Sequence, residues 1–251
     1  MNTKDFTKDF TSNKKYFTQK SPVPFHVTYV IECFIAIIIF YLGAWLWPLA
    51  FAIFTVASVI EVAVCQRYVS DKYYESFLPK EKELFISEFE ALYRPIDPRM
   101  LHRNAVASAA LAEKHGKPIY GGEYRYLDSD FERVGTESQI RQGLDSVVRS
   151  SVYCFTAIQL DPRRVCLMTK RISMTEELEA VDTAALPYKE LSSVSLETVA
   201  LPIQNRAAHC IEIVFVDKEG AERFRLPVHG DYQNEELVDK LNEMIQKNAE
   251  T

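Results

Sequence analysis

The sequence almost entirely lacks charged and strongly polar side chains between Val27 and Cys65. These 39 residues contain no Lys, Arg, Asp, Asn or Gln, and their only formal charges are Glu32 and Glu61. A membrane-crossing helix needs about 20 apolar residues, so the length of the run suits two helices better than one. The scarcity of charge therefore argues against an ordinary solvent-exposed helix and favours membrane spans.

Turn signals divide this apolar run near its middle. Gly43 weakens a helix, and Pro48 can begin a helix but not continue one. Trp45 and Trp47 are the interface aromatics, because tryptophan prefers the boundary between membrane and water. We therefore expect a two-span transmembrane helical hairpin over residues 27–66. A buried hairpin inside a soluble fold is the alternative, but no other segment looks apolar enough to surround it.

Common catalytic and metal-binding motifs are also missing. The sequence has no GxSxG, HExxH, GxGxxG or Walker-type glycine loop, which argues against the corresponding enzyme classes. Its five cysteines form no CxxC pair and no Cys/His ligand spacing, so we expect reduced, mostly buried thiols and no metal site. A thiol–imidazole pair using Cys154 or Cys166 is the remaining enzymatic alternative, but both lie in apolar strands. We predict no catalytic residues and no cofactor.

Charge is distributed unevenly along the chain. The formal charge is +3 before residue 27 and −7 after residue 65. An acidic C-terminal part argues against nucleic-acid binding, which depends on neutralising phosphates. Lysines and arginines flank both ends of the apolar run and are absent from its turn, which predicts cytoplasmic N- and C-termini. We thus expect a multi-pass protein of the bacterial inner membrane, without a signal peptide.

Four regions follow from these patterns. Residues 1–26 form a basic and aromatic tail, which either lies on anionic lipid as an interfacial helix or is a solvated tail. Residues 27–66 are the hairpin, and residues 67–150 form an amphipathic helical linker. Within that linker we expect helices over 80–93 and 98–115, a short strand near 124–127 and a weak helix over 137–148. Residues 151–251 form an α+β domain.

The last region changes to strand periodicity. VYCFTAIQL and VCLMTKRISM predict one antiparallel hairpin, and CIEIVFVD and AERFRLPV predict a second one. Residues 175–185 are interpreted as an acidic, polar insertion, and residues 186–199 as another strand region. Leu237, Leu241 and Ile245 repeat every four residues and predict a closing helix.

The order of LPYKELSSVSLE, IEIVFVDKEGAERFRLPV and NEELVDKLNEMI resembles the bacterial PH-like (GRAM-related) domains. The resemblance covers about residues 151–248. It implies a small bent antiparallel β-barrel with a C-terminal helix plugging one end, and many domains of this kind are tied to membrane helices.

Two groups of charged residues are candidate sites. The membrane-embedded acids Glu32 and Glu61 fall at similar depth in the expected hairpin; they form a proton-linked, ligand-linked or partner-contacting pair, or simply set the depth of the hairpin. The basic residues of the first strand hairpin are the second group: Arg163, Arg164, Lys170 and Arg171. In PH-like domains such a hairpin holds phosphoinositide headgroups, whereas the alternative is a solvated face of the hairpin.

The sequence thus predicts a non-enzymatic, membrane-anchored protein that binds another protein and contacts membrane lipid. One specific version is an immunity protein that neutralises a membrane-targeting toxin. The alternative is a subunit of a membrane transport or secretion assembly, in which Glu32 and Glu61 pack against partner helices.

Overall fold

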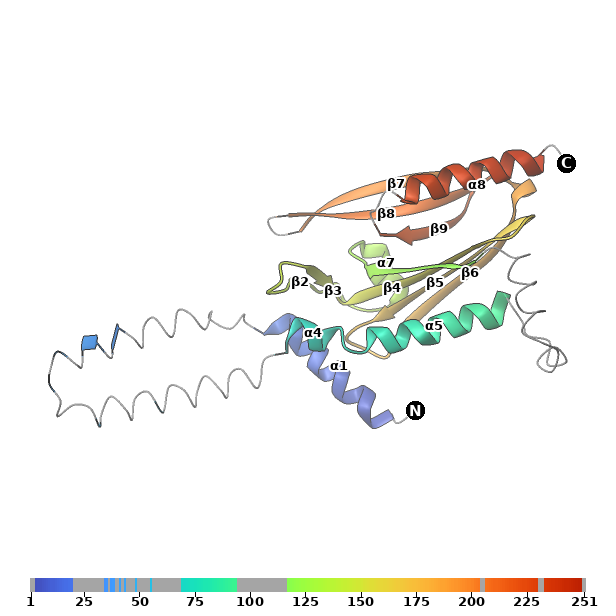
Figure 1. The fold of residues 1–251 in the computed structure, drawn as a ribbon. Helices are drawn as coiled ribbons and strands as arrows, with labels where there is room; N and C mark the ends of the chain where they lie inside the picture. Colours follow the sequence, from blue (N-terminus) through green and yellow to red (C-terminus); the bar gives the residue numbers. More distant parts are fainter. Residues whose placement is uncertain are drawn as a thin grey trace. The chain divides into compact units, whose positions relative to one another are not determined.

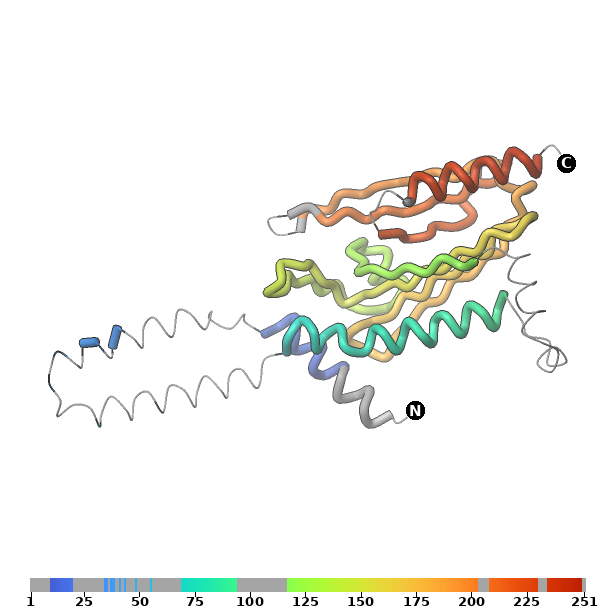
Figure 2. The backbone as a smooth tube through the Cα atoms, viewed as in Figure 1, coloured from blue at the N-terminus to red at the C-terminus, as the bar shows by residue number. Residues whose placement is uncertain are grey.

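The computed structural model describes residues 3–19, 69–93, 117–203, 206–229 and 233–249, together with isolated positions between 34 and 55. The chain divides into two compact units, Met1–Glu75 and Ser76–Thr251. Figures 1 and 2 trace both units along the chain.

The first unit brings together two segments about 50 residues apart in the sequence. Helix α1 (Thr3–Thr18) contributes Tyr16, whose ring stacks on Tyr74 of the short helix α4 (Asp71–Tyr74) at a centroid distance of 4.4 Å. The Tyr16 hydroxyl donates to the Asp71 carboxylate at 2.7 Å. Beyond α1, the Gln19 side-chain amide donates to the Val69 carbonyl and accepts from the Val69 N–H. The basic and aromatic N-terminal segment therefore includes a helix with a defined packing partner.

The second unit contains three antiparallel sheets and three helices among its described residues. The sheets have the strand orders β1-β4-β5-β6, β7-β8-β9 and β2-β3. In chain order the elements are α5 (Leu78–Tyr93), β1 (Ile119–Tyr124), α7 (Asp128–Val134), β2 (Ile140–Gln142), β3 (Val148–Ser150), β4 (Val152–Leu160), β5 (Arg164–Ser173), β6 (Glu179–Pro187), the 3₁₀ turn η2 (Tyr188–Glu190), β7 (Leu191–Ile203), β8 (Arg206–Asp217), β9 (Glu222–Val228) and α8 (Gln233–Ala249). In Figure 1, α5 lies along the four-stranded sheet and α8 along the three-stranded sheet.

Aromatic side chains attach α5 to the four-stranded sheet. Phe85 is fully buried and stacks on Phe155 of β4 at 5.7 Å, and both Phe85 and Phe89 pack edge-to-face on Tyr120 of β1. At the end of the helix, the Tyr93 hydroxyl donates to backbone carbonyls of β5 and β6, each at 3.0 Å. The helix expected over 80–93 is confirmed, but of its apolar residues only Phe85 and Phe89 are buried, whereas Leu84 and Leu92 are exposed.

The main hydrophobic core joins both large sheets to α8. Its buried members include Leu167 of β5, Phe215 of β8 and Leu241 of α8. The Asn242 side chain fixes α8 to β7, because its amide accepts from the Val194 N–H and donates to the Val194 carbonyl, both at 2.9 Å. The expected closing helix and its apolar repeat are thus confirmed.

The expected membrane hairpin requires a correction. Over the parts of the chain that the structure describes, no helix has both the length and the apolar character needed to cross a membrane. Helices α1, α5 and α8 have 16, 16 and 17 residues and interleave charged with apolar side chains. This finding contradicts the predicted two-span hairpin and the multi-pass inner-membrane location that depended on it. Most of residues 27–66 lie outside the described residues.

The expected barrel is also corrected. The described strands form three separate sheets and do not close into one barrel. The physical reason is visible in the register: β6 pairs only with β5, and β9 pairs only with β8, so each large sheet retains an edge within the described part of the chain.

Individual elements differ in how well the sequence predicted them. The hairpins β4–β5 and β8–β9 are confirmed. The supposed insertion 175–185 instead contains most of β6, the strand near 124–127 lies earlier as β1, and the weak helix 137–148 is replaced by strands β2 and β3. The expected helix over 98–115 lies outside the described residues.

Candidate functional site

A buried arginine lies at the centre of the charged groups in the second unit. Arg125 directly follows β1, and its side chain is 0% exposed. Its Nη1 donates to Glu123 at 2.7 Å, its Nε donates to Asp130 at 2.8 Å, and its Nη2 bonds Glu212 of β8. A buried guanidinium requires such partners because it has lost its hydration. Arg125 thereby connects β1, α7 and the three-stranded sheet.

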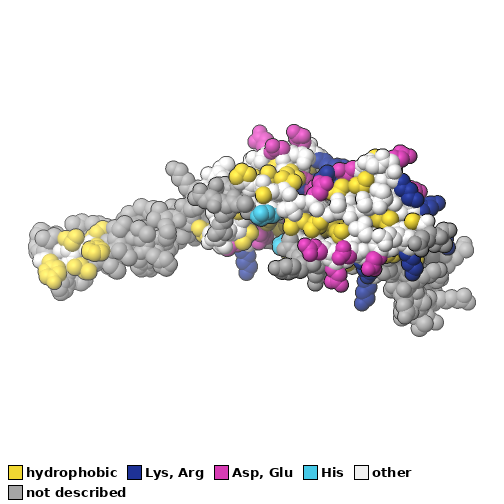
Figure 3. Space-filling model, turned by 90° about the horizontal axis from the view of Figure 1, so that it is seen from above, with side chains coloured by type: hydrophobic (Ala, Val, Ile, Leu, Met, Phe, Trp, Pro, Cys, Tyr) yellow, Lys and Arg dark blue, Asp and Glu magenta, His cyan; other side chains and the backbone are white. Residues whose placement is uncertain are grey.

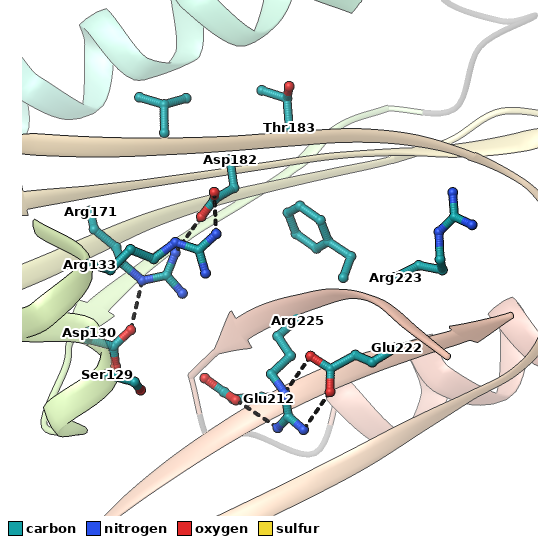
Figure 4. A pocket seen from close by; sticks show the side chains of 12 residues that line it. Ser129, Asp130, Arg133, Arg171, Asp182, Thr183, Glu212, Glu222, Arg223 and Arg225 are labelled. Carbon is teal, nitrogen blue, oxygen red and sulfur yellow. Dashed lines mark hydrogen bonds and ion pairs between the residues drawn. The ribbon is translucent and has the colours of Figure 1, made fainter. Parts of the chain in front are cut away.

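The chain of ion pairs continues along the four-stranded sheet. The second oxygen of Asp130 accepts from Nε of Arg171 at 2.7 Å. Nη1 of Arg171 donates to Asp182 of β6 at 2.9 Å, and the other Asp182 oxygen accepts from Nη2 of Arg133 at 2.5 Å. Figure 4 shows this alternation of arginine and carboxylate across β5, β6 and α7.

A second branch runs along the three-stranded sheet. The remaining oxygen of Glu212 accepts from Nη1 of Arg225 at 3.3 Å. Arg225 also binds Glu222 through two parallel bonds of 2.7 Å each and Glu197 at 2.8 Å. We call the connected set the arginine–carboxylate network. Its members are Arg125, Arg133, Arg171, Arg225, Glu123, Asp130, Asp182, Glu197, Glu212 and Glu222.

Strand register and one short helix position these side chains. Glu123 lies opposite Cys154, and Cys154 lies opposite Arg171, so the three occupy neighbouring positions across β1, β4 and β5. Asp130 lies in the first turn of α7, where a carboxylate interacts favourably with the helix dipole. Gly135 ends α7 in the left-handed conformation, with φ of 80°, which glycine adopts without steric cost. The strand register and the helix α7 thus place the Asp130 carboxylate within hydrogen-bonding distance of both Arg125 and Arg171.

A cavity of about 650 Å³ opens beside the network. It is lined by Ser129, Asp130, Arg133, Arg171, Val181, Asp182, Thr183, Glu212, Glu222, Arg223, Phe224 and Arg225. Four of these residues are acidic and four are arginines. Two edge strands, β6 and β9, contribute to its wall, together with α7, β5 and β8. Figure 4 shows β6 on one side of the opening and β9 on the other.

Burial perturbs the acid–base properties of the network. Burial raises the pKa of Glu123 to about 7, although Arg125 opposes that shift. Burial by itself would lower the pKa of Arg125, but the carboxylates of Asp130, Glu212 and Glu123 raise it above its ordinary value. Burial also raises the pKa of the Cys154 thiol to about 12. Arg125 is therefore permanently charged, Cys154 is an inert thiol at neutral pH, and Glu123 titrates near neutrality.

The predicted basic patch of the first hairpin is divided among separate contacts. Lys170 and Arg171 are both buried: Lys170 pairs with Glu88 of α5 at 2.9 Å, whereas Arg171 belongs to the network. Arg164 pairs with Asp161 at 3.3 Å, and Arg163 is exposed in the turn. The structure thus places these four side chains in different surroundings. Glu32, Glu61, Trp45 and Trp47 lie outside the described residues.

The sequence did carry one overlooked signal for the network. In the strand CIEIVFVD, the side chains of Cys210, Glu212 and Val214 point to the same face of the sheet. All three are buried. A charge in the buried phase of an apolar strand requires a partner of opposite charge. Its partner Arg125 lies 87 residues away, so the spacing of the sequence gave no indication of the pairing.

The charged groups that line the cavity hold one another in place. Arginines and carboxylates hold one another by hydrogen bonds, and the described cysteines, Cys154, Cys166 and Cys210, are all buried and free. Within the described segments, no three His, Cys, Asp or Glu side chains gather in a way that would hold a metal ion. The fixed charges therefore constitute a preorganised polar surface.

No protein-family model matches this sequence, and no curated protein and no solved structure matches it either.

Proposed function

We propose that this chain is a non-enzymatic binding protein, and that a partner protein inserts an extended segment into the cavity between its two large sheets. The observation that carries the proposal is the position of the cavity between two edge strands, β6 and β9. An edge strand presents backbone N–H and C=O groups that another extended chain can pair with.

The form of β6 supports this proposal. Its residues alternate between exposed and partly buried from Glu179 to Ala185, so one set of side chains faces outward along the edge. Val181 and Thr183 belong to the exposed set and contribute to the cavity wall, whereas Asp182 of the network points to the opposite face of β6 (Figure 4). An incoming segment would meet a strand edge and side chains already fixed in position, which lowers the entropic cost of binding.

On the face seen in Figure 3, acidic and basic side chains are interspersed, with hydrophobic side chains between them. Such mixing is normal for a protein surface, so the proposal rests on the strand edges and the cavity. The expectations of a toxin as the partner, and of a PH-like domain, stay predictions.

Peptide display tests this function. A random library is selected on the full chain, and the selected peptides are then measured on Val181→Trp and Val199→Trp. Both valines lie on strands at sheet edges and have similar exposure, 45% and 40%, but only Val181 lines the cavity. We expect Val181→Trp to weaken binding at least about tenfold, as loss of roughly 1.4 kcal/mol would do. Val199→Trp should leave binding within about twofold. Peptides indifferent to Val181→Trp would contradict the proposal.

A further inference from the structure

We infer that the partner segment is an amphipathic β-strand, whose aliphatic side chains pack beside Val181 and Leu92 while its polar side chains face the arginine–carboxylate network. This inference rests on the proposed function, because it specifies the chemistry of the segment that pairs with β6. It follows from the different surroundings that the two faces of β6 offer to a strand added at its edge.

The register of β5 and β6 assigns each β6 side chain to one face of the sheet. Val181 lies opposite Lys170, and residues that lie opposite each other point to the same face. Lys170 bonds Glu88 of α5, so Lys170 and Val181 both point to the face along which α5 lies. Asp182, one residue later, points to the other face, toward the network. Figure 4 shows Thr183 and Asp182 on opposite sides of β6.

The face along which α5 lies has an accessible strip beside the edge of β6 that no described strand pairs with. Val181 is 45% exposed. Thr183 and Ala185 follow it at alternate positions of the same strand and are exposed as well. None of these three side chains carries a charge, so an aliphatic side chain can pack against them without removing water from an ion.

Leu92 extends this strip from the helix. It directly precedes Tyr93, whose hydroxyl donates to a β6 carbonyl at 3.0 Å. It also lies one turn after Glu88, on the same side of α5, and Glu88 and Glu179 of β6 both bond Lys170. These two contacts place Leu92 on the β6 side of the helix. Its side chain is 51% exposed, which leaves apolar surface for a partner to bury.

The other face of β6 is polar beside the same edge. Asp182 bonds Arg171 and Arg133, and all three residues line the cavity. Ala180 and Ala184 share the face of Asp182 and are small and half-buried. A large apolar side chain added here would take water from charged groups and give them no hydrogen bond in return, which costs free energy. Polar side chains are therefore favoured on this side of an added strand.

An added strand must serve both faces at once. Successive side chains of a strand point to opposite faces, so every second residue of the partner meets the strip of Val181 and Leu92. The residues between them meet the network. Backbone pairing with β6 supplies affinity for any extended segment, whereas this alternation selects among segments. The partner sequence should therefore alternate aliphatic and polar residues along the stretch that pairs with residues 179–185.

A second copy of the chain fits this edge less well. Its own β6 carries an acid on each face, Glu179 on one and Asp182 on the other. In an antiparallel β6–β6 pair centred on residue 181, 182 or 183, the two Asp182 side chains would lie opposite or diagonal to each other, and like charges at these positions are destabilising. Val181 is also the only large aliphatic residue of the stretch 179–185. A different chain with several aliphatic residues is the better occupant.

The peptides selected on the full chain test this inference. We expect those sensitive to Val181→Trp to alternate aliphatic and polar residues, and a scrambled peptide of the same composition to bind at least about tenfold more weakly. Leu92→Gln should weaken the alternating peptides at least about fivefold, because it removes apolar contact surface. Ile119→Gln is the matched control, since Ile119 is 52% exposed on β1 at the opposite edge of the same sheet. It should leave binding within about twofold.

A double-mutant cycle separates direct contact from a structural effect of Leu92→Gln. Replacing the peptide's aliphatic residue that contacts Leu92 by Gln should weaken binding about tenfold on the wild type, but less than about threefold on Leu92→Gln. Replacing a neighbouring polar residue of the peptide should have the same effect on both chains. Far-UV circular dichroism and thermal melting confirm that each variant is folded.

The other outcomes separate the two proposals. Peptides that are sensitive to Val181→Trp but show no alternation overturn this inference and leave the proposed function intact. Equal effects of Leu92→Gln and Ile119→Gln also overturn it. Failure to select any peptide sensitive to Val181→Trp overturns both proposals. Sedimentation equilibrium is measured as well: a dimer of the full chain that Val181→Trp dissociates would make a second copy the occupant, and the inference would be wrong.

Discussion

The carboxylate of Asp130, in the first turn of α7, accepts a hydrogen bond from Nε of Arg171 at 2.7 Å and so ties this short helix to β5. The other Asp130 oxygen accepts from Arg125, so one side chain joins two buried guanidinium groups. Buried ion pairs contribute little net stability when compared with apolar packing, but breaking one leaves an uncompensated charge. The network should therefore be sensitive to removal of a single member.

Replacing Arg125 tests this sensitivity. Arg125→Met removes the guanidinium that pairs with Glu123, Asp130 and Glu212, and leaves buried carboxylates with fewer partners. We expect the free energy of unfolding to fall by about 3–5 kcal/mol, measured by urea denaturation. Arg163→Met, at an exposed position, should change it by less than about 0.5 kcal/mol. If the two variants had similar free energies of unfolding, the ion pairs of Arg125 would not contribute to stability.

Glu123 should make stability depend on pH near neutrality. Its pKa is raised from 4.5 to about 7 by burial, so between these values the folded chain binds more protons than the unfolded chain. The contribution of Glu123 to stability is present at low pH, falls as pH rises from about 4.5 to 7, and is lost above pH 7.

Glu123→Gln isolates this effect, because the amide oxygen still accepts from Arg125 and does not ionise. Relative to this variant, the wild type should lose about 1–3 kcal/mol of unfolding free energy between pH 5 and pH 8. Denaturation curves at several pH values provide the measurement, and Glu235→Gln, at an exposed site on α8, is the control. Parallel pH profiles for wild type and Glu123→Gln would refute the prediction.

Phe85 should account for much of the attachment of α5. Phe85→Ala removes a fully buried ring that contacts Phe155 and Tyr120, so we expect a loss of about 3–5 kcal/mol in unfolding free energy. Leu84→Ala changes the neighbouring residue, which is 38% exposed, and should cost well under half as much. Equal effects at the two positions would mean that α5 does not pack on the sheet through Phe85.

Position 121 requires glycine because the side chain of Thr156 approaches it closely within the sheet. A Cβ at this position would lie 2.7 Å from Oγ1 of Thr156, the residue opposite it on β4. Gly121→Ala should therefore destabilise the chain by about 1–3 kcal/mol, as overpacking does. In a double-mutant cycle with Thr156→Ala, the two costs should be less than additive, because the alanine at 156 removes the obstructing oxygen. Full additivity would rule out this contact as the cause.

The sequence predicted those elements whose signal is local. The hairpins β4–β5 and β8–β9 follow from alternating apolar residues, and α8 follows from Leu237, Leu241 and Ile245, because both patterns depend only on neighbouring positions. Strand β6 escaped prediction because its polar residues were interpreted as an insertion. Asp182 in fact lies in this strand, and its carboxylate pairs with Arg133 and Arg171.

The network and the cavity depend on distant pairing and were not predictable in this way. Arg125 and Glu212 are 87 residues apart, and Arg171 and Asp130 are 41 apart; only the folded sheets bring them together. The membrane location was inferred from the apolar run, its two tryptophans and the positive charges at its ends, and the finding on the described helices contradicts it. The apolar run and the candidate acids Glu32 and Glu61 fall largely outside the described residues.

The doubly bonded carboxylates of Asp130, Asp182 and Glu212 have a consequence for how this sequence can diverge. Each carboxylate accepts hydrogen bonds from two arginines, so a neutral substitution at one acid removes a partner from two arginines at once. A compensating change must therefore occur at more than one position. Divergent versions of this chain should therefore keep the whole set or replace it together with apolar residues. Intermediates that lose a single charge would be the least stable, so we expect these positions on α7, β5, β6, β8 and β9 to change together with Arg125, which follows β1.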